Sequence, residues 1–278
     1  MSEQPNPAPT PSPRPVATLP SALERFDALR RRLAGRTPAL FLDYDGTLTP
    51  IVARPELAIL SDAARATVAR VARTLPTAVI SGRDRADVTA LVGIDGLVYA
   101  GSHGFDIFVP GRGELHLAGS ADFAAPLDVL EAELRTRVGD IPGALIERKR
   151  YSIAAHYRQV TTADYPRFRD GLDQALAAVQ DIREKPGKKV FDFQPAIDWD
   201  KGRCVLALLE TLGLGDAGYL PIFFGDDVTD EDAFRALHGR GLGVVVAGAD
   251  EARESAADFR VDDPDAVLAL LARLAAAP

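Results

Sequence analysis

The sequence predicts an α/β fold with a doubly wound, parallel-sheet (Rossmann-like) core and an α+β module inserted into it. Short apolar runs alternate with helical patterns in both outer parts of the chain, as in parallel sheets. Glycines and carboxylates follow several of these runs, at the strand ends where open α/β sheets bind ligands. The middle of the chain instead combines two helical patterns with stretches that resemble antiparallel strands.

Composition excludes several classes of protein. The chain has 278 residues, 47% of them apolar and 26% charged, which is ordinary for a globular protein. A net charge of -8 argues against a general nucleic-acid or anionic-membrane surface. The single Cys204 excludes an internal disulfide and favours a reducing compartment. We therefore expect a cytoplasmic, monomeric protein that acts on a small molecule and has no nucleic-acid or membrane partner.

The first 36 residues are expected to form a tail and a linker helix. Pro, Ser, Thr and Ala dominate the chain up to about Pro20, without the apolar core of a secretory signal. Such a composition is typical of a disordered, partly polyproline II segment with too few large apolar residues to pack.

The core is expected over residues 37–116 and 198–278. Apolar runs predict its strands, and Ser61 is a plausible N-cap for the helix that follows the first of them. The expected strands are residues 40–42, 77–80, 97–100, 222–224, 243–246 and 259–261.

The inserted cap is expected over residues 117–197. Residues 128–138 and 165–178 look helical, whereas residues 144–148, 151–157 and 189–195 look like antiparallel strands. Polar residues recur there with period two, which places each pair on one face of its strand. The pairs are Glu147 with Lys149, His156 with Arg158, and Asp192 with Gln194. Two interpretations stay open from this pattern, a solvated outer face and a sugar-binding lid.

The strongest signal for chemistry is Asp43-Tyr44-Asp45-Gly46-Thr47, directly after an apolar run. One carboxylate at such a strand end can attack phosphorus, and its neighbour can move the proton of the leaving group. The same five residues could instead form only a turn with an Asx hydrogen bond.

Three further segments should reach the same sheet edge. Ser81 and Gly82 offer a hydroxyl and a backbone N–H for a phosphate oxygen, and Lys201 starts a helix. Asp226, Asp227 and Asp230 add carboxylates after a later strand, although they could serve only as helix caps. So many carboxylates at one edge would repel one another, and a hard divalent ion such as Mg²⁺ resolves this.

These segments resemble the four motifs of the haloacid dehalogenase superfamily of phosphotransferases, and more narrowly the trehalose-6-phosphate phosphatase family. The narrower resemblance rests on residues 101–104 (Gly-Ser-His-Gly), 199–202 (Trp-Asp-Lys-Gly) and 225–234 (Gly-Asp-Asp-Val-Thr-Asp-Glu-Asp-Ala-Phe). It covers the chain from about Ala39 to the C-terminus, with support in the cap from residues 147–149 and 156–158.

The resemblance implies a Mg²⁺-dependent hydrolysis in two steps. Asp43 would attack phosphorus and Asp45 would act as acid and then base, with Lys201 as the third catalytic residue. Thr47, Ser81, Gly82 and Lys201 would hold the phosphoryl group. The implied metal site consists of Asp43, the Asp45 backbone carbonyl and Asp226, supported by Asp227 and Asp230; the implied sugar contacts are Glu147, Lys149, His156, Arg158 and Asp192.

One departure concerns the sugar contacts. Where the family usually has Glu-x-Arg-Pro, this chain has Asp192-Phe193-Gln194-Pro195, so the cation is lost. Other phosphatases with a similar cap, for sucrose-phosphate or mannosyl-phosphoglycerate, remain alternatives, as do a phosphomutase and a non-catalytic regulatory domain. A phospho-accepting receiver also pairs Asp residues with a distal Lys, but it is much shorter and has no insert.

Overall fold

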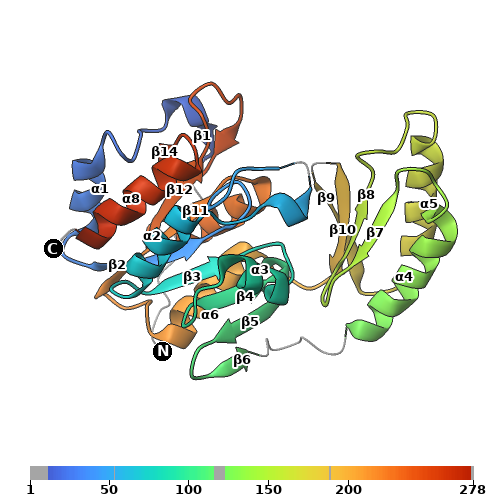
Figure 1. Ribbon diagram of the computed structural model, residues 1–278, viewed down its shortest axis with the longest axis horizontal. Helices are drawn as coiled ribbons and strands as arrows, with labels where there is room; N and C mark the ends of the chain where they lie inside the picture. Colours follow the sequence, from blue (N-terminus) through green and yellow to red (C-terminus); the bar gives the residue numbers. More distant parts are fainter. Residues whose placement is uncertain (1–11, 53, 116–122, 188, 277–278) are drawn as a thin grey trace, which may run out of the picture. The chain divides into compact units, whose positions relative to one another are not determined.

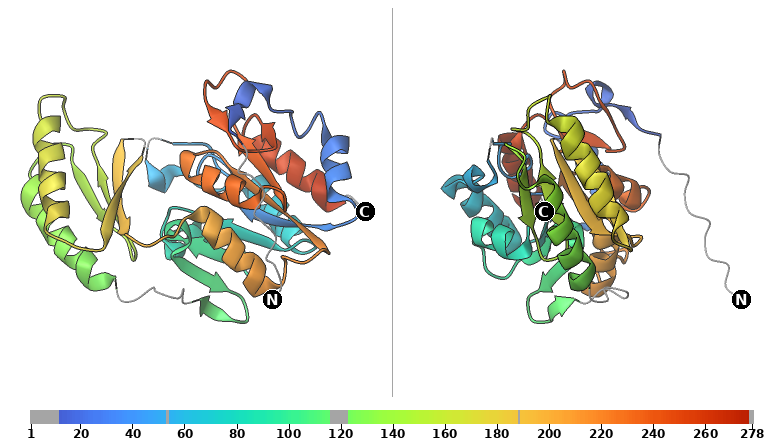
Figure 2. Two further views of the ribbon diagram at one scale, coloured as in Figure 1. Left: turned by 180° about the vertical axis from the view of Figure 1, so that it is seen from behind. Right: turned by 90° about the vertical axis from the view of Figure 1, so that its right-hand side faces the viewer.

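The structure is a computed structural model that describes residues 12–52, 54–115, 123–187 and 189–276. The chain divides into two compact units, Met1–Leu115 with Trp199–Pro278 and His116–Asp198. We refer to them as the core and the cap. The path of the chain through both is coloured in Figures 1 and 2. None of the helices in the described residues is both long and apolar enough to cross a membrane.

The core is built on an eight-stranded sheet in the order β14-β12-β11-β2-β3-β4-β5-β6. The first six strands in this order run parallel, and β5 and β6 continue the sheet as antiparallel strands. The strands are β2 (Thr37–Leu42), β3 (Thr77–Ile80), β4 (Val98–Gly101), β5 (Asp106–Val109), β6 (Gly113–Leu115), β11 (Tyr219–Gly225), β12 (Leu242–Val246) and β14 (Phe259–Val261). This confirms the α/β fold class and adds an antiparallel edge that the apolar runs did not predict.

Helices cover both faces of this sheet. One apolar cluster joins the sheet to α1 (Phe26–Leu33), α2 (Asp62–Ala72), α3 (Arg85–Val92) and α8 (Pro264–Ala276). On the other face α7 (Glu231–Leu237) packs on the sheet through the Phe223–Phe234 ring contact. The helix α6 (Lys201–Leu212) packs against α7, since Gly202 lies against the Asp232 backbone. Short 3-10 turns occur at η1 (Val16–Thr18), η2 (Pro55–Leu57), η3 (Ser102–Gly104) and η4 (Val228–Asp230).

The N-terminal segment is not the disordered tail that composition predicts, as far as it is described. Residues 1–11 of that tail lie outside the described residues. From there on, β1 (Arg14–Pro15) pairs antiparallel with β13 (Glu254–Ser255), and Val16 and Leu19 are buried. The prediction was wrong for residues 12–20. The pairing of β1 with β13 and the burial of Val16 and Leu19 hold this proline-rich segment in place.

The cap is a four-stranded antiparallel sheet with two helices on one face. The strand order is β7-β8-β10-β9, and α4 and α5 share an apolar cluster with one side of these strands. The elements are α4 (Ala124–Val138), β7 (Leu145–Arg148), β8 (Ile153–His156), α5 (Tyr165–Ala177), β9 (Ile182–Gly187) and β10 (Val190–Pro195). The sequence predicted the helices and three of the strands; it did not predict β9, whose Pro186 and Gly187 are typical of a turn.

Candidate active site

The turn after β2 presents the first carboxylate. Asp43 is 5% exposed, and its N–H donates to the Phe224 carbonyl of the neighbouring strand at 2.9 Å, which fixes where the side chain leaves the sheet. Gly46 follows with a φ of +81°, a conformation that glycine adopts without steric cost. A Cβ at Gly46 would also lie 2.1 Å from Asp226 Oδ2, so the turn needs glycine for space as well.

Lys201 connects two of the carboxylates. Its Nζ donates to Asp43 Oδ1 at 2.8 Å and to Asp230 Oδ1 at 2.6 Å, and its side chain is 3% exposed. The helix that carries it begins as the sequence predicts, because the Asp200 side chain caps α6 by accepting from the Arg203 N–H at 2.8 Å. A cation is thereby held beside the Asp43 carboxylate in a buried position.

The loop after β11 places Asp226 in the same cluster. Asp230 Oδ2 accepts from the N–H groups of Asp226 and Asp227, both at 2.9 Å, and Asp227 forms a reciprocal capping box with Asp230. Both oxygens of Asp230 are therefore already engaged, one by Lys201 and one by the backbone. Asp226 Oδ1, by contrast, is buried without a hydrogen-bond partner among the described residues.

This arrangement raises the pKa values of two carboxyls. Burial raises the pKa of Asp43 to about 7, although Lys201 opposes the shift. Burial, followed by the charges of Asp43 and Asp230, raises the pKa of Asp226 to about 9. Repulsion of this kind is relieved when a cation binds between the carboxylates.

The donor set fits a hard divalent cation. Carboxylate oxygens of Asp43, Asp226 and Asp230 lie within 4.8 Å of one another. Oxygen-only ligands suit Mg²⁺, and the partnerless Asp226 Oδ1 is the kind of buried oxygen that a metal would satisfy. Of the predicted ligands, Asp43 and Asp226 belong to this cluster of side-chain oxygens, whereas the ligand predicted from Asp45 is its backbone carbonyl, which such a cluster does not test. Asp230 is the third member, although its oxygens are already bonded.

Asp45 is instead held by Arg83, an interaction that the sequence does not predict. Arg83 Nε and Nη2 donate to the two Asp45 oxygens, each at 2.7 Å, and Arg83 Nη1 donates to Asp87 at 2.8 Å. The Arg83 side chain is largely buried over the Tyr44 ring, whereas the Asp45 side chain is 42% exposed. The only signal available beforehand was the position of Arg83 two residues after Ser81 in the second motif.

Two of the predicted phosphate ligands, Thr47 and Ser81, lie in buried positions, and Gly82 is half-buried. Thr47 and Ser81 are each at most 1% exposed. Thr47 Oγ1 has no hydrogen-bond partner among the described residues, while Ser81 Oγ accepts from the Arg83 N–H at 3.2 Å. Gly82 lies against the His103 ring, and a Cβ there would come 2.7 Å from His103 Cε1. The position therefore tolerates only glycine without movement of the ring.

His103 belongs to an unusual backbone segment at the end of β4. Ser102 and His103 have φ values of 49° and 57°, so two successive residues with a Cβ adopt the left-handed conformation. Their N–H groups donate to the carbonyls of Arg83 and Ser81 at 2.7 and 2.8 Å. This strained segment braces the loop after β3; in the sequence, residues 101–104 stand out only through the family resemblance.

In the cap, the predicted polar face forms. The register pairs Glu147 with Ala154, Asp192 with Ala154, and Asp192 with Lys185, so these side chains share one face of the sheet. His156 Nε2 lies 2.9 Å from Glu147 Oε2. Burial raises the pKa of the Asp192 carboxyl, while the charges of Lys149 and His156 lower it in part. Arg158 lies beyond the end of β8 and is exposed.

Comparison with known proteins agrees with this geometry. A trehalose-phosphatase family model matches residues 41–265. The trehalose-phosphate phosphatase of Mycobacterium tuberculosis is 40% identical over 94% of this chain and 67% of its own length. An uncharacterized glycosyl hydrolase from the same species is 42% identical over 94% of this chain, which spans only 20% of that protein.

The fold comparison leads to the same family. The C-terminal domain of the Candida albicans trehalose-6-phosphate phosphatase superposes with a TM-score of 0.75 at 25% identity, covering 94% of this chain and 99% of that domain. The family match spans most of the core and the whole cap, including every predicted site residue. The chain belongs to the trehalose-phosphatase family, within the haloacid dehalogenase superfamily.

Proposed function

We propose that this chain is a Mg²⁺-dependent phosphatase that hydrolyses trehalose 6-phosphate to trehalose and inorganic phosphate. The observation that carries the proposal is the buried Asp43–Lys201–Asp230 network beside the partnerless oxygen of Asp226. It supplies a nucleophile, a cation and a metal-ligand set at one sheet edge. The free, buried Cys204 is consistent with a reducing compartment, and we assign the reaction to the cytoplasm.

In the first step, an oxygen of Asp43 forms a bond to phosphorus while the bond from phosphorus to the sugar oxygen breaks. Lys201 holds Asp43 Oδ1, so we assign Oδ2 as the attacking atom. Asp45 gives its proton to the departing sugar oxygen, and the products of this step are trehalose and an aspartyl-phosphate. In the second step Asp45 takes a proton from water, which attacks phosphorus and releases phosphate from Asp43.

Mg²⁺ would be held by Asp43, Asp226 and the Asp45 backbone carbonyl, and when bound it neutralises charge on the phosphoryl oxygens. Asp230 and Asp227 then act indirectly, because Asp230 orients Lys201 and holds the loop that carries Asp226. Thr47 Oγ1, Ser81 and the Gly82 N–H are assigned to the phosphoryl oxygens. Arg83 positions the acid, because both of its bonds to Asp45 restrain that carboxyl.

Recognition of the sugar is assigned to the polar face of the cap sheet. Glu147, Lys149, His156, Arg158 and Asp192 offer both donors and acceptors, as a polyhydroxylated ligand requires. Gln194 has an amide where the family motif usually has a cation, but its side chain is buried, so we assign it an indirect effect on sugar specificity, through its neighbours on the sheet.

A phosphate-release screen tests the proposal. Purified protein is offered trehalose 6-phosphate, sucrose 6-phosphate, glucose 6-phosphate and a small aryl phosphate, with Mg²⁺ or with excess chelator. The expected result is the highest kcat/KM for trehalose 6-phosphate and no turnover in chelator. Preference for another sugar phosphate would change the proposed substrate and leave the proposed phosphatase mechanism in place. Full activity in chelator would overturn the metal assignment, and no turnover of any substrate would favour a regulatory domain.

A further inference from the structure

The carbonyl of Asp226 is held by a residue that no part of the proposed mechanism uses. Arg253 Nη2 donates to the Asp226 carbonyl oxygen at 2.5 Å, and Arg253 Nε pairs with Glu251 Oε1 at 2.8 Å. The Arg253 side chain is 20% exposed. It comes from the loop between β12 and β14, whereas Asp226 follows β11, so the contact connects two loops at neighbouring strand ends.

The main chain of Asp226 is therefore fixed on both sides. Its N–H donates to Asp230 Oδ2 at 2.9 Å, and its C=O accepts from Arg253. With both backbone groups held, the direction in which the carboxylate leaves the chain is determined. The Asp226 carboxylate occupies the space that a side chain at residue 46 would need, so Gly46 leaves room for it there.

The loop that carries Arg253 is itself anchored to the motif. The Ala256 N–H donates to Glu231 Oε2 at 2.8 Å, and Glu231 is a buried residue at the start of α7. This second connection means that residues 253–256 and the Asp226 loop form one hydrogen-bonded unit. Contacts on the side of residues 253–256 that faces away from Asp226 therefore help to fix the position of Asp226.

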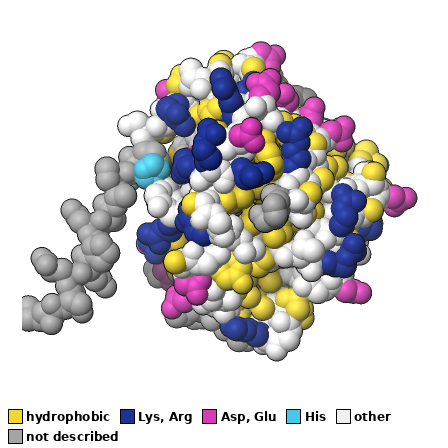
Figure 3. Space-filling view, turned by 90° about the vertical axis from the view of Figure 1, so that its left-hand side faces the viewer, with side chains coloured by type: hydrophobic (Ala, Val, Ile, Leu, Met, Phe, Trp, Pro, Cys, Tyr) yellow, Lys and Arg dark blue, Asp and Glu magenta, His cyan; other side chains and the backbone are white. Residues whose placement is uncertain are grey.

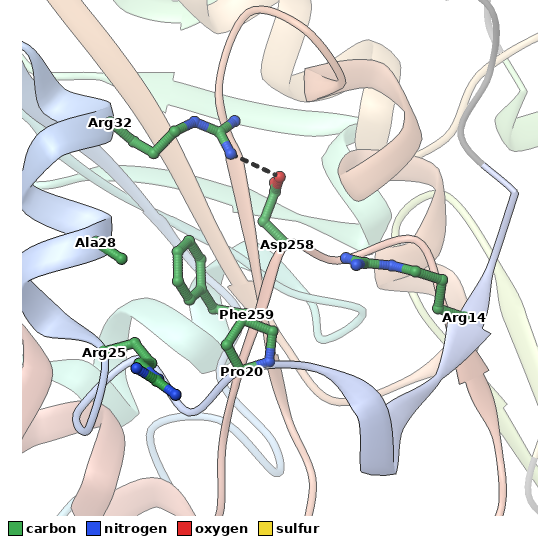
Figure 4. Close-up of a pocket in the computed structure, with 7 residues that line it drawn as sticks. All are labelled: Arg14, Pro20, Arg25, Ala28, Arg32, Asp258 and Phe259. Carbon is green, nitrogen blue, oxygen red and sulfur yellow. Dashed lines mark hydrogen bonds and ion pairs between the residues drawn. The ribbon is translucent and has the colours of Figure 1, made fainter.

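The outer side is held by the N-terminal segment. Besides the pairing of β1 with β13, the Val16 N–H donates to the Arg253 carbonyl oxygen at 2.9 Å. Arg14 Nη2 donates to the Ala257 carbonyl at 3.3 Å, and the Arg260 N–H donates to the Pro20 carbonyl at 3.0 Å. Figure 1 shows β1 beside the C-terminal strands, and Figure 4 shows Arg14 and Pro20 beside Asp258 and Phe259.

We propose that Arg253 is a positioning residue for the metal ligand Asp226, and that residues 14–20, which we name the N-terminal strap, hold Arg253 in place. The strap is thus a working part of the catalytic centre although it contributes no group to it. The inference rests on the proposed function for the identity of the metal. It goes beyond that function by assigning a role to two segments outside the four motifs.

Metal affinity measured without substrate tests the role of Arg253. Mg²⁺ binding is followed by titration calorimetry for the wild type and for Arg253→Met, which keeps the length of the side chain and removes the guanidinium. Variants that disturb a positioning partner of a metal ligand typically lose about 10- to 100-fold in affinity, and we expect about tenfold here. Turnover at saturating Mg²⁺ should fall less than turnover at limiting Mg²⁺.

Arg235→Met is the matched control. Arg235 also pairs with a carboxylate, Asp232 at 2.9 Å, within α7 and close to the same motif, and it is partly exposed. Its loss should leave Mg²⁺ affinity within about twofold of the wild type, since a surface ion pair contributes little. Equal Mg²⁺ affinity of Arg253→Met and wild type would overturn the proposal. No Mg²⁺ binding by the wild type would instead contradict the proposed metal site.

Two substitutions at Val16 test the strap. Val16→Pro removes the N–H that donates to Arg253, and Pro15, with φ −51° and ψ 129°, already has the conformation favoured before a proline. Val16→Ala keeps the N–H and loses more buried side chain than Val16→Pro, since the proline ring has as many carbons as the valine side chain, so a larger effect in Val16→Pro cannot come from lost apolar contact. Loss of one backbone hydrogen bond should weaken Mg²⁺ binding about two- to tenfold in Val16→Pro relative to Val16→Ala.

Truncation gives an independent outcome. Removal of residues 1–11 keeps the whole strap and should leave Mg²⁺ affinity unchanged, whereas removal of residues 1–20 should lower it in the same direction as Arg253→Met. If the longer truncation does not fold, the Val16 pair still decides. Equal Mg²⁺ affinity in the two Val16 variants would show that the strap does not act through Arg253.

Discussion

The carboxylate edge of the core and the polar face of the cap both gather charged side chains, but they do so under opposite conditions. In the core, Asp43 and Lys201 are almost fully buried and bonded to each other. In the cap, the Glu147 side chain is 45% exposed and the His156 side chain 29% exposed. A buried network cannot rearrange without leaving a charge unpaired, whereas exposed side chains can adapt to a ligand. The first suits chemistry and the second suits recognition.

The strongest test of this contrast is Asp43→Asn. The amide keeps the shape of the carboxylate but cannot attack phosphorus, so turnover should fall at least about a thousandfold on every substrate. Phosphate release from trehalose 6-phosphate and from an aryl phosphate measures it, with thermal unfolding as the check on folding. Residual activity above a hundredth of the wild type in a folded variant would remove Asp43 from the nucleophile's role.

Lys201→Met should act in the same substrate-independent way. It removes a buried cation beside the reacting carboxylate, and loss of one such charge typically costs about 10²–10³ in kcat. The comparison is kcat against KM for both substrates. Because the change leaves Asp43 and Asp230 buried without their cation, stability should fall too, and Mg²⁺ should restore part of it. An effect confined to KM for the sugar phosphate would assign Lys201 to recognition.

Glu147→Ala should lower activity on the sugar phosphate much more than activity on the aryl phosphate. If Glu147 binds a sugar hydroxyl, kcat/KM for trehalose 6-phosphate should fall roughly 10- to 150-fold, while a small aryl phosphate is hydrolysed almost as before. Glu133→Ala is the matched control, since within the described part of the chain Glu133 forms an ion pair only with Arg137, on the helical side of the cap. Equal losses on both substrates would mean that the polar face does not read the sugar.

Arg83→Leu should separate, within the core, proton donation to the leaving group from binding of the phosphoryl group. Without its two bonds to Arg83, Asp45 is less restrained, and we expect about a tenfold loss in kcat for trehalose 6-phosphate. An aryl phosphate with an acidic phenol needs little help from a proton donor and should lose less. The same loss on both leaving groups would assign Arg83 to the phosphoryl group instead.

The smallest expected effect concerns stability and pH. The pKa values of Asp43 and Asp226 are raised to about 7 and about 9, so the folded metal-free protein binds more protons than the unfolded chain above pH 4. Through these two carboxyls, its free energy of unfolding should therefore fall as pH rises from about 4 toward 9. Excess Mg²⁺ should oppose the decline. Asp226→Asn should flatten it between pH 7 and 9, and a wild-type Tm independent of pH would contradict the raised pKa values.

Local sequence patterns predicted most of the elements of the fold. β3 spans the predicted residues 77–80, and Ser61 caps α2 by accepting from the Ala64 N–H, because both features depend on a few adjacent residues. The pairing of β1 with β13 joins residues about 240 positions apart and has two residues on each strand, so no local signal announces it. The Arg83–Asp45 bond is missed for the same reason.

The candidate site was predictable as a set of segments but not as a network. Motif order places Asp43, Lys201 and Asp226 near one another, and the structure brings them together. Which oxygen each cation takes depends on side-chain directions that spacing does not determine. Asp230 illustrates the limit, since its two oxygens are shared between Lys201 and two backbone N–H groups. The roles of these residues and of the cap residues remain predictions.

The strand order has a consequence for how the protein is made. At the centre of the core sheet, β2 pairs with β11, so residues 37–42 meet partners at residues 219–224. The cap, in contrast, is one continuous stretch of chain. During synthesis, the cap sequence is complete while β2 still lacks its central neighbour. The cap can therefore fold on the ribosome first, whereas β2, which can pair with β3 early, keeps its other edge unpaired until residues 219–224 have emerged, so the environment of Asp43 is completed late in translation.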